Sequence, residues 1–299
     1  AGLYAEYHGI EHLALEAYWF RLRDAASVND TNNVWYIEAV EDLVGWDDYD
    51  PTTLHTLALR ASGEFGAFDY ALSAAYQFGD ADRIGALFRP FAYGDNRAEF
   101  DAWAGDAEVG YAFDMPWQPR VYLGAAYFGG EDNRDVGFFE WLNPFRRGDA
   151  SVSFNRLFSN WEYSQFIDNS DLSNAHIFRA GVSAMPTESI ELEMSLAYFL
   201  ADETFATPMY WNLGGFRVPL FPTRSYATSD TDDELGWELG LTATYHYSED
   251  LTFEAGWAHL FTSDGLTDGN FSVGNGLVFT GGTDDQDADY LYFETKIAF

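Results

Sequence analysis

The sequence predicts an all-β fold, a transmembrane antiparallel β-barrel of the outer-membrane type. Three observations predict it: segments of about ten residues alternate apolar and polar side chains, aromatic residues are abundant, and the connections alternate between short and long. Phe, Tyr and Trp together make up 18% of the 299 residues. Barrels of this type carry girdles of aromatic side chains at both lipid interfaces, which accounts for such a content.

Eleven segments show the period of two that places alternate side chains on opposite faces of a strand. In one of them Leu192 and Met194 share one face, and Glu191 and Glu193 share the other. A tilted strand needs about nine to eleven residues to cross a bilayer, and these segments are long enough. The predicted strands are 2–8, 13–23, 54–63, 68–78, 101–113, 119–129, 175–185, 190–200, 235–247, 251–260 and 289–299.

The connections between these segments differ in length in a regular way. Short turns such as PTES and SED alternate with long polar stretches near 25–53, 79–100, 130–173, 201–234 and 261–288. Outer-membrane barrels have short turns on the periplasmic side and longer loops outside. We therefore expect residues 1–299 to form a single β-barrel domain with these five stretches as extracellular loops.

The strand count also bears on the N-terminal side of the barrel. Eleven is odd, whereas single-chain bacterial barrels normally have an even number of strands. The first segment is followed by the short turn GIEH, so it already runs toward the periplasm. We expect N-terminal strands to precede residue 1. The alternative is a strand overlooked in a long loop, such as ASVSFNRLF at 150–158.

Composition and motifs exclude several other classes of protein. The chain has 49 acidic and 15 basic residues, whereas nucleic-acid binding needs clustered Lys and Arg. It contains no cysteine, so thiolate metal sites and disulfides are absent. Neither a metalloprotease HExxH motif nor a GxSxG nucleophile elbow occurs. We expect neither an enzyme nor a nucleic-acid partner.

Five stretches resemble the alginate export family of outer-membrane proteins. They are LEAYWFRL (15–22), FDYALSAAYQFGD (68–80), DAEVGYAFDMPWQPRVYLGAAYFGGEDN (106–133), FNRLFSNW (154–161) and ELGLTATYHYSEDLTFEAGWAHLF (238–261). The resemblance implies a porin-like barrel of up to eighteen strands, of which the eleven seen here would be the C-terminal part. It also implies a bacterial outer-membrane location, among lipid and lipopolysaccharide. The ending, with Phe293, Ile297 and Phe299, resembles the signal that the barrel assembly machinery recognises.

The alternation assigns one set of charged side chains to the lumen. The predicted pore-lining acids are Glu6, Glu16, Asp69, Asp106, Glu108, Glu191, Glu193, Glu238, Glu254 and Glu294, and the bases are Arg60, Arg120, Arg179 and Lys296. A wall with an excess of carboxylates concentrates cations and repels anions. We therefore expect a channel that passes small cationic or neutral solutes, sugars among them, by diffusion.

Two alternatives remain open at this point. The first is an exporter of an acidic polysaccharide, in which the four bases would form a constriction, as the family resemblance implies. The second is a structural barrel that sheathes or anchors an envelope protein partner. The bases could also pair with neighbouring carboxylates and only shape the lumen.

Clusters of acidic residues in the long stretches are candidate Ca²⁺ ligands, because hard oxygen ligands suit that ion. The candidates are Asp230, Asp232, Asp233, Asp284, Asp285 and Asp287. None has the Gly and Glu spacing of an EF-hand, and a solvated acidic surface is the alternative. No other cofactor is expected.

Overall fold

The structure is a computed structural model of the chain, and it describes residues 1–24, 52–80, 98–130, 150–156, 163–165, 173–203, 206–208, 210–213, 216–219, 228–230, 232–265 and 287–298. Its centre is one antiparallel sheet in which each long strand pairs with the next along the chain. The eleven strands on this path are β1 (Gly2–Ile10), β2 (Leu13–Asp24), β3 (Thr52–Phe65), β4 (Phe68–Asp80), β5 (Ala98–Ala112), β6 (Arg120–Phe128), β8 (Ala175–Thr187), β9 (Ile190–Ala201), β14 (Glu234–His246), β15 (Leu251–Thr262) and β16 (Ala288–Ile297). They confirm the eleven predicted strands.

The described part of the chain also contains five shorter strands. β7 (Ala150–Val152) pairs in parallel with β5, so the stretch at 150–158 contains a short strand beside the wall. β10 (Ala206–Pro208) pairs with β13 (Thr228–Asp230), and β11 (Tyr210–Leu213) pairs with β12 (Phe216–Pro219). These two small ribbons belong to the long connection between β9 and β14.

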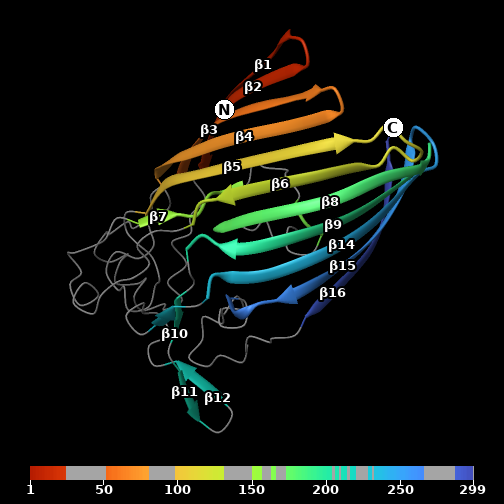
Figure 1. Cartoon of the computed structure of the whole chain (residues 1–299). Helices are drawn as coiled ribbons and strands as arrows, with labels where there is room; N and C mark the ends of the chain where they lie inside the picture. Colours follow the sequence, from red (N-terminus) through yellow and green to blue (C-terminus); the bar gives the residue numbers. More distant parts are fainter. Residues whose placement is uncertain are drawn as a thin grey trace.

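The sheet is a curved wall with its short and long connections at opposite ends. Figure 1 shows the turns after β1, β3, β5, β8 and β14 at one end, on the right in this view. The long connections leave from the other end. Short turns face the periplasm in outer-membrane barrels, and the extracellular position of the long connections stays a prediction.

The pairing register decides which side chains share a face. Residues directly opposite each other on paired strands point to the same side of a sheet. Glu16 pairs with Arg60, Arg60 with Ser73, and Ser73 with Asp106, so these four lie on one face. We call this face, which carries the charged residues, the inner face, and the opposite one the outer face.

Aliphatic side chains cover the middle of the outer face and are exposed. Leu59 on β3 and Leu123 on β6 retain 65% and 63% of their accessible surface, and Leu196 on β9 retains 41%. Soluble proteins rarely expose contiguous apolar patches of this extent. An aliphatic band of this kind is suited to the hydrocarbon core of a bilayer.

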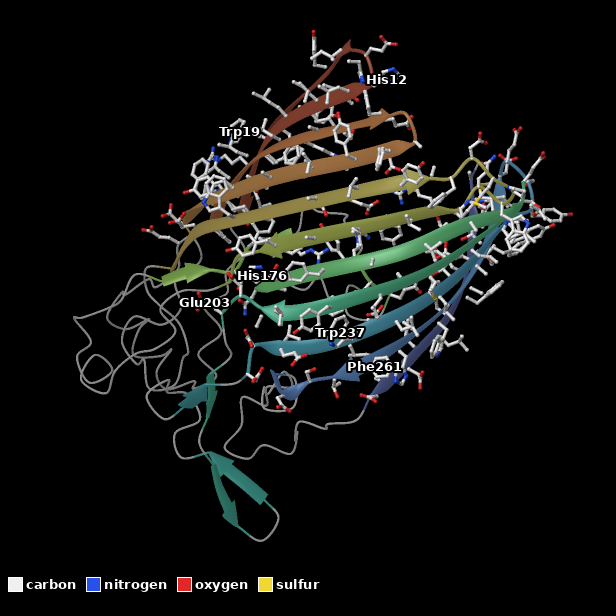
Figure 2. All side chains as sticks on the ribbon, viewed as in Figure 1. His12, Trp19, His176, Glu203, Trp237 and Phe261 are labelled. Atoms are coloured by element: carbon white, nitrogen blue, oxygen red, sulfur yellow. The ribbon has the colours of Figure 1, made fainter. Side chains whose placement is uncertain are left out.

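Aromatic side chains flank that band on the outer face. Toward the long connections, Tyr76 packs on Trp103 with ring centroids 4.5 Å apart, and Tyr198 stacks on Trp237 at 4.2 Å. Trp19, Trp237 and Phe261 mark this level on three strands in Figure 2. Toward the short turns, Phe68 packs on Tyr111, and Phe253 stacks on Phe293. Two such girdles around an aliphatic band are typical of the lipid-facing surface of an outer-membrane barrel.

Within the segments that the structure describes, no helix has the length and apolar character needed to cross a membrane.

Candidate functional site

All fourteen predicted pore-lining residues lie on the inner face. The register links them across the wall, for example from Glu108 through Gly124 and Arg179 to Ala197 and Glu238. The same pairing connects Glu191 through Thr244 to Glu254, and Glu254 to Glu294. The structure therefore gathers the charged groups on one surface, and their role in lining a pore stays a prediction.

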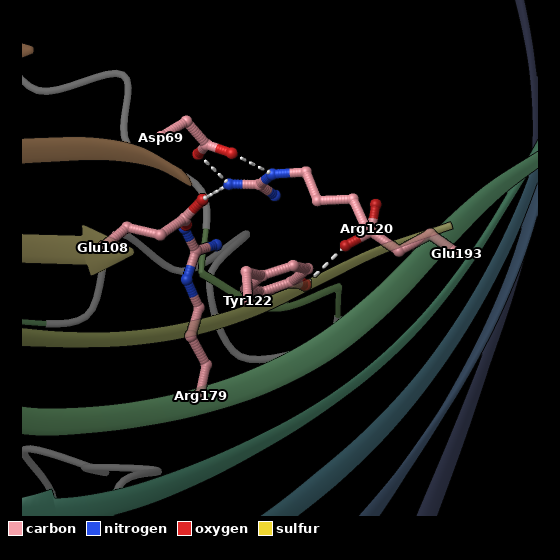
Figure 3. A network of polar contacts seen from close by, with 6 residues as sticks. All are labelled: Asp69, Glu108, Arg120, Tyr122, Arg179 and Glu193. Atoms are coloured by element: carbon pink, nitrogen blue, oxygen red, sulfur yellow. Dashed lines mark hydrogen bonds and ion pairs between the residues drawn. The ribbon is translucent and has the colours of Figure 1, made fainter. Parts of the chain in front are cut away.

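Two arginines and three carboxylates form a network on this surface, centred on Glu108 (Figure 3). Arg120 donates to Asp69 through Nε at 2.9 Å and through Nη2 at 2.5 Å, so the pair is bidentate. The same Nη2 donates to Glu108 Oε1 at 2.8 Å. Arg179 donates to the other oxygen of Glu108. Bidentate Arg–carboxylate contacts are among the strongest polar contacts in proteins and fix both side chains.

Tyr122 lies between the two arginines and joins them to a third carboxylate. The guanidinium carbons of Arg120 and Arg179 lie 5.2 and 5.3 Å from its ring centroid, within cation–π range. Its hydroxyl donates to Glu193 Oε1 at 2.5 Å. The network thus joins side chains from β4, β5, β6, β8 and β9.

Glycines on the inner face leave room for this network. A Cβ at Gly110 would collide with the guanidinium of Arg120 and with the Asp69 carboxylate. A Cβ at Gly124 would approach Arg179 Nε to 2.9 Å. Both guanidinium groups can therefore approach the sheet closely at these glycines, which a larger residue at either position would prevent.

The other two predicted bases belong to separate pairs. Arg60 Nε lies 3.9 Å from Glu16 Oε1. Lys296 Nζ lies 3.4 Å from Glu254 Oε2 and 3.5 Å from Glu294 Oε2. Each predicted base thus contacts at least one predicted acid, and only Arg120 and Arg179 share a carboxylate.

A segment between β7 and β8 folds onto the inner face; we call residues 153–156 and 163–165 the inward segment. The side-chain amide of Gln77 on β4 donates to the carbonyl of Asn155 at 2.8 Å, and the Asn155 N–H donates back to Gln77 Oε1 at 2.7 Å. Further along the sheet, on the same inner face, the N–H of Gln165 donates to Glu238 Oε1 at 2.5 Å. The segment therefore contacts both β4 and β14.

Aromatic and cationic groups pack the inward segment against the middle of the wall. The Arg156 guanidinium lies 4.6 Å from the ring centroid of Phe128, which is completely buried, and 5.6 Å from that of Tyr163. Phe154 packs on Phe128 with centroids 5.9 Å apart. Burial raises the pKa of Tyr163, and the negative charge of Asp106 raises it further, so the hydroxyl of Tyr163 stays protonated. These contacts narrow the space beside the Glu108 network.

Sequence reasoning assigned Glu238 to the lumen, but it predicted neither the contact of Glu238 with this segment nor the role of Gln77. Gln77 and Glu238 are 0% and 2% exposed, although both lie on the polar face of a strand. Buried polar side chains need hydrogen-bond partners, and here the inward segment provides them. One feature of the sequence could have pointed to the inward segment: the FNRLF stretch carries Phe154 and Arg156 but lacks the alternation of a strand.

The Ca²⁺ prediction stays untested. Among the residues whose side chains the structure describes, no group of three His, Cys, Asp or Glu is arranged to hold a metal ion. The side chain of Asp230 and the whole of Asp284 and Asp285 lie outside the described residues. Of the predicted assembly signal, Phe293 and Ile297 are exposed on the outer face, and Phe299 lies outside the described residues.

Replacing one arginine of the network tests whether the inner face controls ion permeation. We expect Arg120→Gln to shift the reversal potential in a planar bilayer further toward the cation side, because it removes one positive charge and leaves the Asp69 carboxylate without its bidentate partner. The matched control is Arg21→Gln, which removes the same charge from the outer face of β2. Equal shifts in the two variants would show that the network has no special influence on permeation.

The lipid-facing wall, the flanking aromatic girdles and the charged inner face define an outer-membrane β-barrel protein. The family model described as alginate export matches residues 1–278, and the chain belongs to that family. This membership confirms the resemblance found in the sequence and the bacterial outer-membrane location. No curated protein gives a significant match.

Three solved structures have limited similarity to the chain. The FrpB iron transporter of Neisseria meningitidis is 13% identical, with a TM-score of 0.41, and the match covers 86% of this chain and 34% of that one. The toluene transporter TodX of Pseudomonas putida is 10% identical, with a TM-score of 0.33 and coverages of 86% and 67%. A FadL homologue of Pseudomonas aeruginosa is also 10% identical, with a TM-score of 0.33 and coverages of 87% and 59%. The chain thus spans about a third of the length of FrpB.

Proposed function

We propose that the chain forms the wall of an outer-membrane channel that passes small cationic or neutral solutes, sugars among them, by diffusion. The observation that supports this most directly is the composition of the inner face, where ten predicted acids and four predicted bases share one surface and every one of the bases contacts an acid. The remaining negative charge favours cations in the lumen.

The size of the electrostatic effect depends on how narrow the lumen is. Two unit charges about 4 Å apart interact with roughly 4 kcal/mol at an effective dielectric constant near 20. Salt screens this interaction over about 8 to 10 Å, so only a solute passing close to the wall feels it strongly. The inward segment brings solutes close to the wall by occupying part of the space beside Glu108 and Glu238.

The reversal potential of the purified protein in a planar bilayer under a KCl gradient tests the proposal. We expect a potential on the cation side, because the net charge of the inner face is negative. The measurement should be repeated at high salt, where screening should reduce the selectivity. A potential on the anion side would overturn the proposed selectivity.

A second candidate function follows from the positions of Arg120 and Arg179. Both guanidinium groups flank Tyr122 and share Glu108, so a polyanion that displaced the carboxylate would meet two adjacent positive charges. This arrangement favours an exporter of acidic polysaccharide, and an anion-side potential would move that candidate to first place. Absence of conductance would instead favour a structural barrel that sheathes or anchors an envelope partner.

A further inference from the structure

A pocket on the inner face of the first four strands is separate from the Glu108 network. Its cavity has a volume of about 210 Å³, and its walls come from β1 to β4 and from the inward segment. Sites for drug-sized ligands usually measure roughly 300 to 1,000 Å³, so this one is suited to a single ring-sized molecule. Phe154 and Asn155 close it on one side.

Three aromatic side chains line this pocket from the first hairpin. Tyr4 on β1 is directly opposite Tyr18 on β2, and the ring centroids of Tyr18 and Phe20 are 5.0 Å apart. All three lie on the inner face, whereas the lipid-contacting girdles lie on the outer face. Aromatic rings in this position offer flat apolar faces to a molecule in the lumen.

Polar groups converge on the same cavity. Tyr4 donates to Glu16 Oε2 at 2.9 Å, and Glu16 lies beside Arg60, so the charged groups of the pocket are balanced. The Ser73 hydroxyl is buried at the wall and has no hydrogen-bond partner among the residues that the structure describes. A buried hydroxyl of this kind costs free energy unless a ligand or water satisfies it.

We propose that this pocket binds the pyranose ring of a neutral sugar. The weakly polar face of the ring would lie against the aromatic side chains, and its hydroxyls would bond Glu16, Arg60 and Ser73. The inference rests on the proposed function, since it names the solute class that the channel would admit. The balanced charge of Glu16 and Arg60, with Glu6 opposite Glu16, favours a neutral sugar over a carboxylated one.

The test is a glucose titration of the full chain in a zwitterionic, sugar-free detergent, followed by saturation-transfer NMR. We expect saturable binding to the wild type, an affinity at least about tenfold lower for Tyr18→Ala, and a nearly unchanged affinity for Tyr18→Phe, which keeps the ring. The matched control is Tyr290→Ala, which removes an inner-face aromatic residue from β16, far along the sheet. Glucuronate should bind more weakly than glucose.

The outcomes distinguish a failure of the proposed sugar site from a failure of the proposed channel. Equal affinity of Tyr18→Ala and the wild type, or tighter binding of glucuronate, would overturn the assignment. So would a loss of binding in Tyr290→Ala as large as that in Tyr18→Ala. A conducting pore that binds no glucose would keep the proposed function and remove the sugar site. Binding by a protein that conducts no ions would support the pocket and remove the channel.

Discussion

Leu196→Arg should strongly impair folding into a membrane. Leu196 lies on the outer face in the middle of β9 and retains 41% of its accessible surface, so the new charge would face the hydrocarbon core. An arginine at the bilayer midplane costs about 2 to 4 kcal/mol on the lipid face of such barrels. The folded fraction in lipid vesicles, followed by urea titration, measures the effect.

The matched control for this prediction is on the same strand but on the opposite face. Glu191 is a charged residue of the inner face, and Glu191→Arg introduces the same side chain toward the lumen. We expect it to fold like the wild type and to alter only ion selectivity. If both variants lost the same free energy of unfolding, the assignment of the two faces would be wrong.

The faces could be predicted from sequence because they depend only on the period of two. Asp69, Glu108, Arg120 and Arg179 come from four strands, yet alternation alone assigned all four to one surface. A shift of register by one residue would have reversed a whole strand. The apolar residues on the alternate positions decided which face of each strand meets lipid, because only that set of side chains suits a lipid environment.

The contacts within the site could not be predicted in the same way. Arg120 on β6 meets Asp69 on β4, two strands away, because the register pairs Asp69 with Gly110 and Gly110 with Tyr122. That register depends on strand twist and turn geometry, which a single sequence does not reveal. The inward segment was harder still, because it has no periodicity and is positioned by tertiary contacts.

Gln77→Leu should release the β4 side of the inward segment and widen the conducting path. The Gln77 amide satisfies both the N–H and the carbonyl of Asn155 and also donates to Thr56 Oγ1 at 3.1 Å. Leucine can form none of these bonds, and each buried polar group left unsatisfied costs about 1 to 3 kcal/mol. The segment can avoid that cost by moving into the lumen water. Single-channel recording should therefore show a larger and noisier conductance.

Two further variants make this prediction specific to the inward segment. Gln77→Glu keeps an acceptor for the Asn155 N–H but loses the donor to its carbonyl, so its conductance should be intermediate. Thr244→Val removes a hydroxyl from the inner face of β14 with little change in side-chain size, close to the short turn that leads to β15. This variant should leave the conductance unchanged. A wild-type conductance in Gln77→Leu would mean that the Gln165–Glu238 contact and the aromatic packing hold the segment by themselves, or that the segment does not restrict the pore. The first explanation would contradict the anchoring role assigned to Gln77, which rests on its paired bonds to the N–H and the carbonyl of Asn155, and the second would contradict the restriction of the pore by the inward segment.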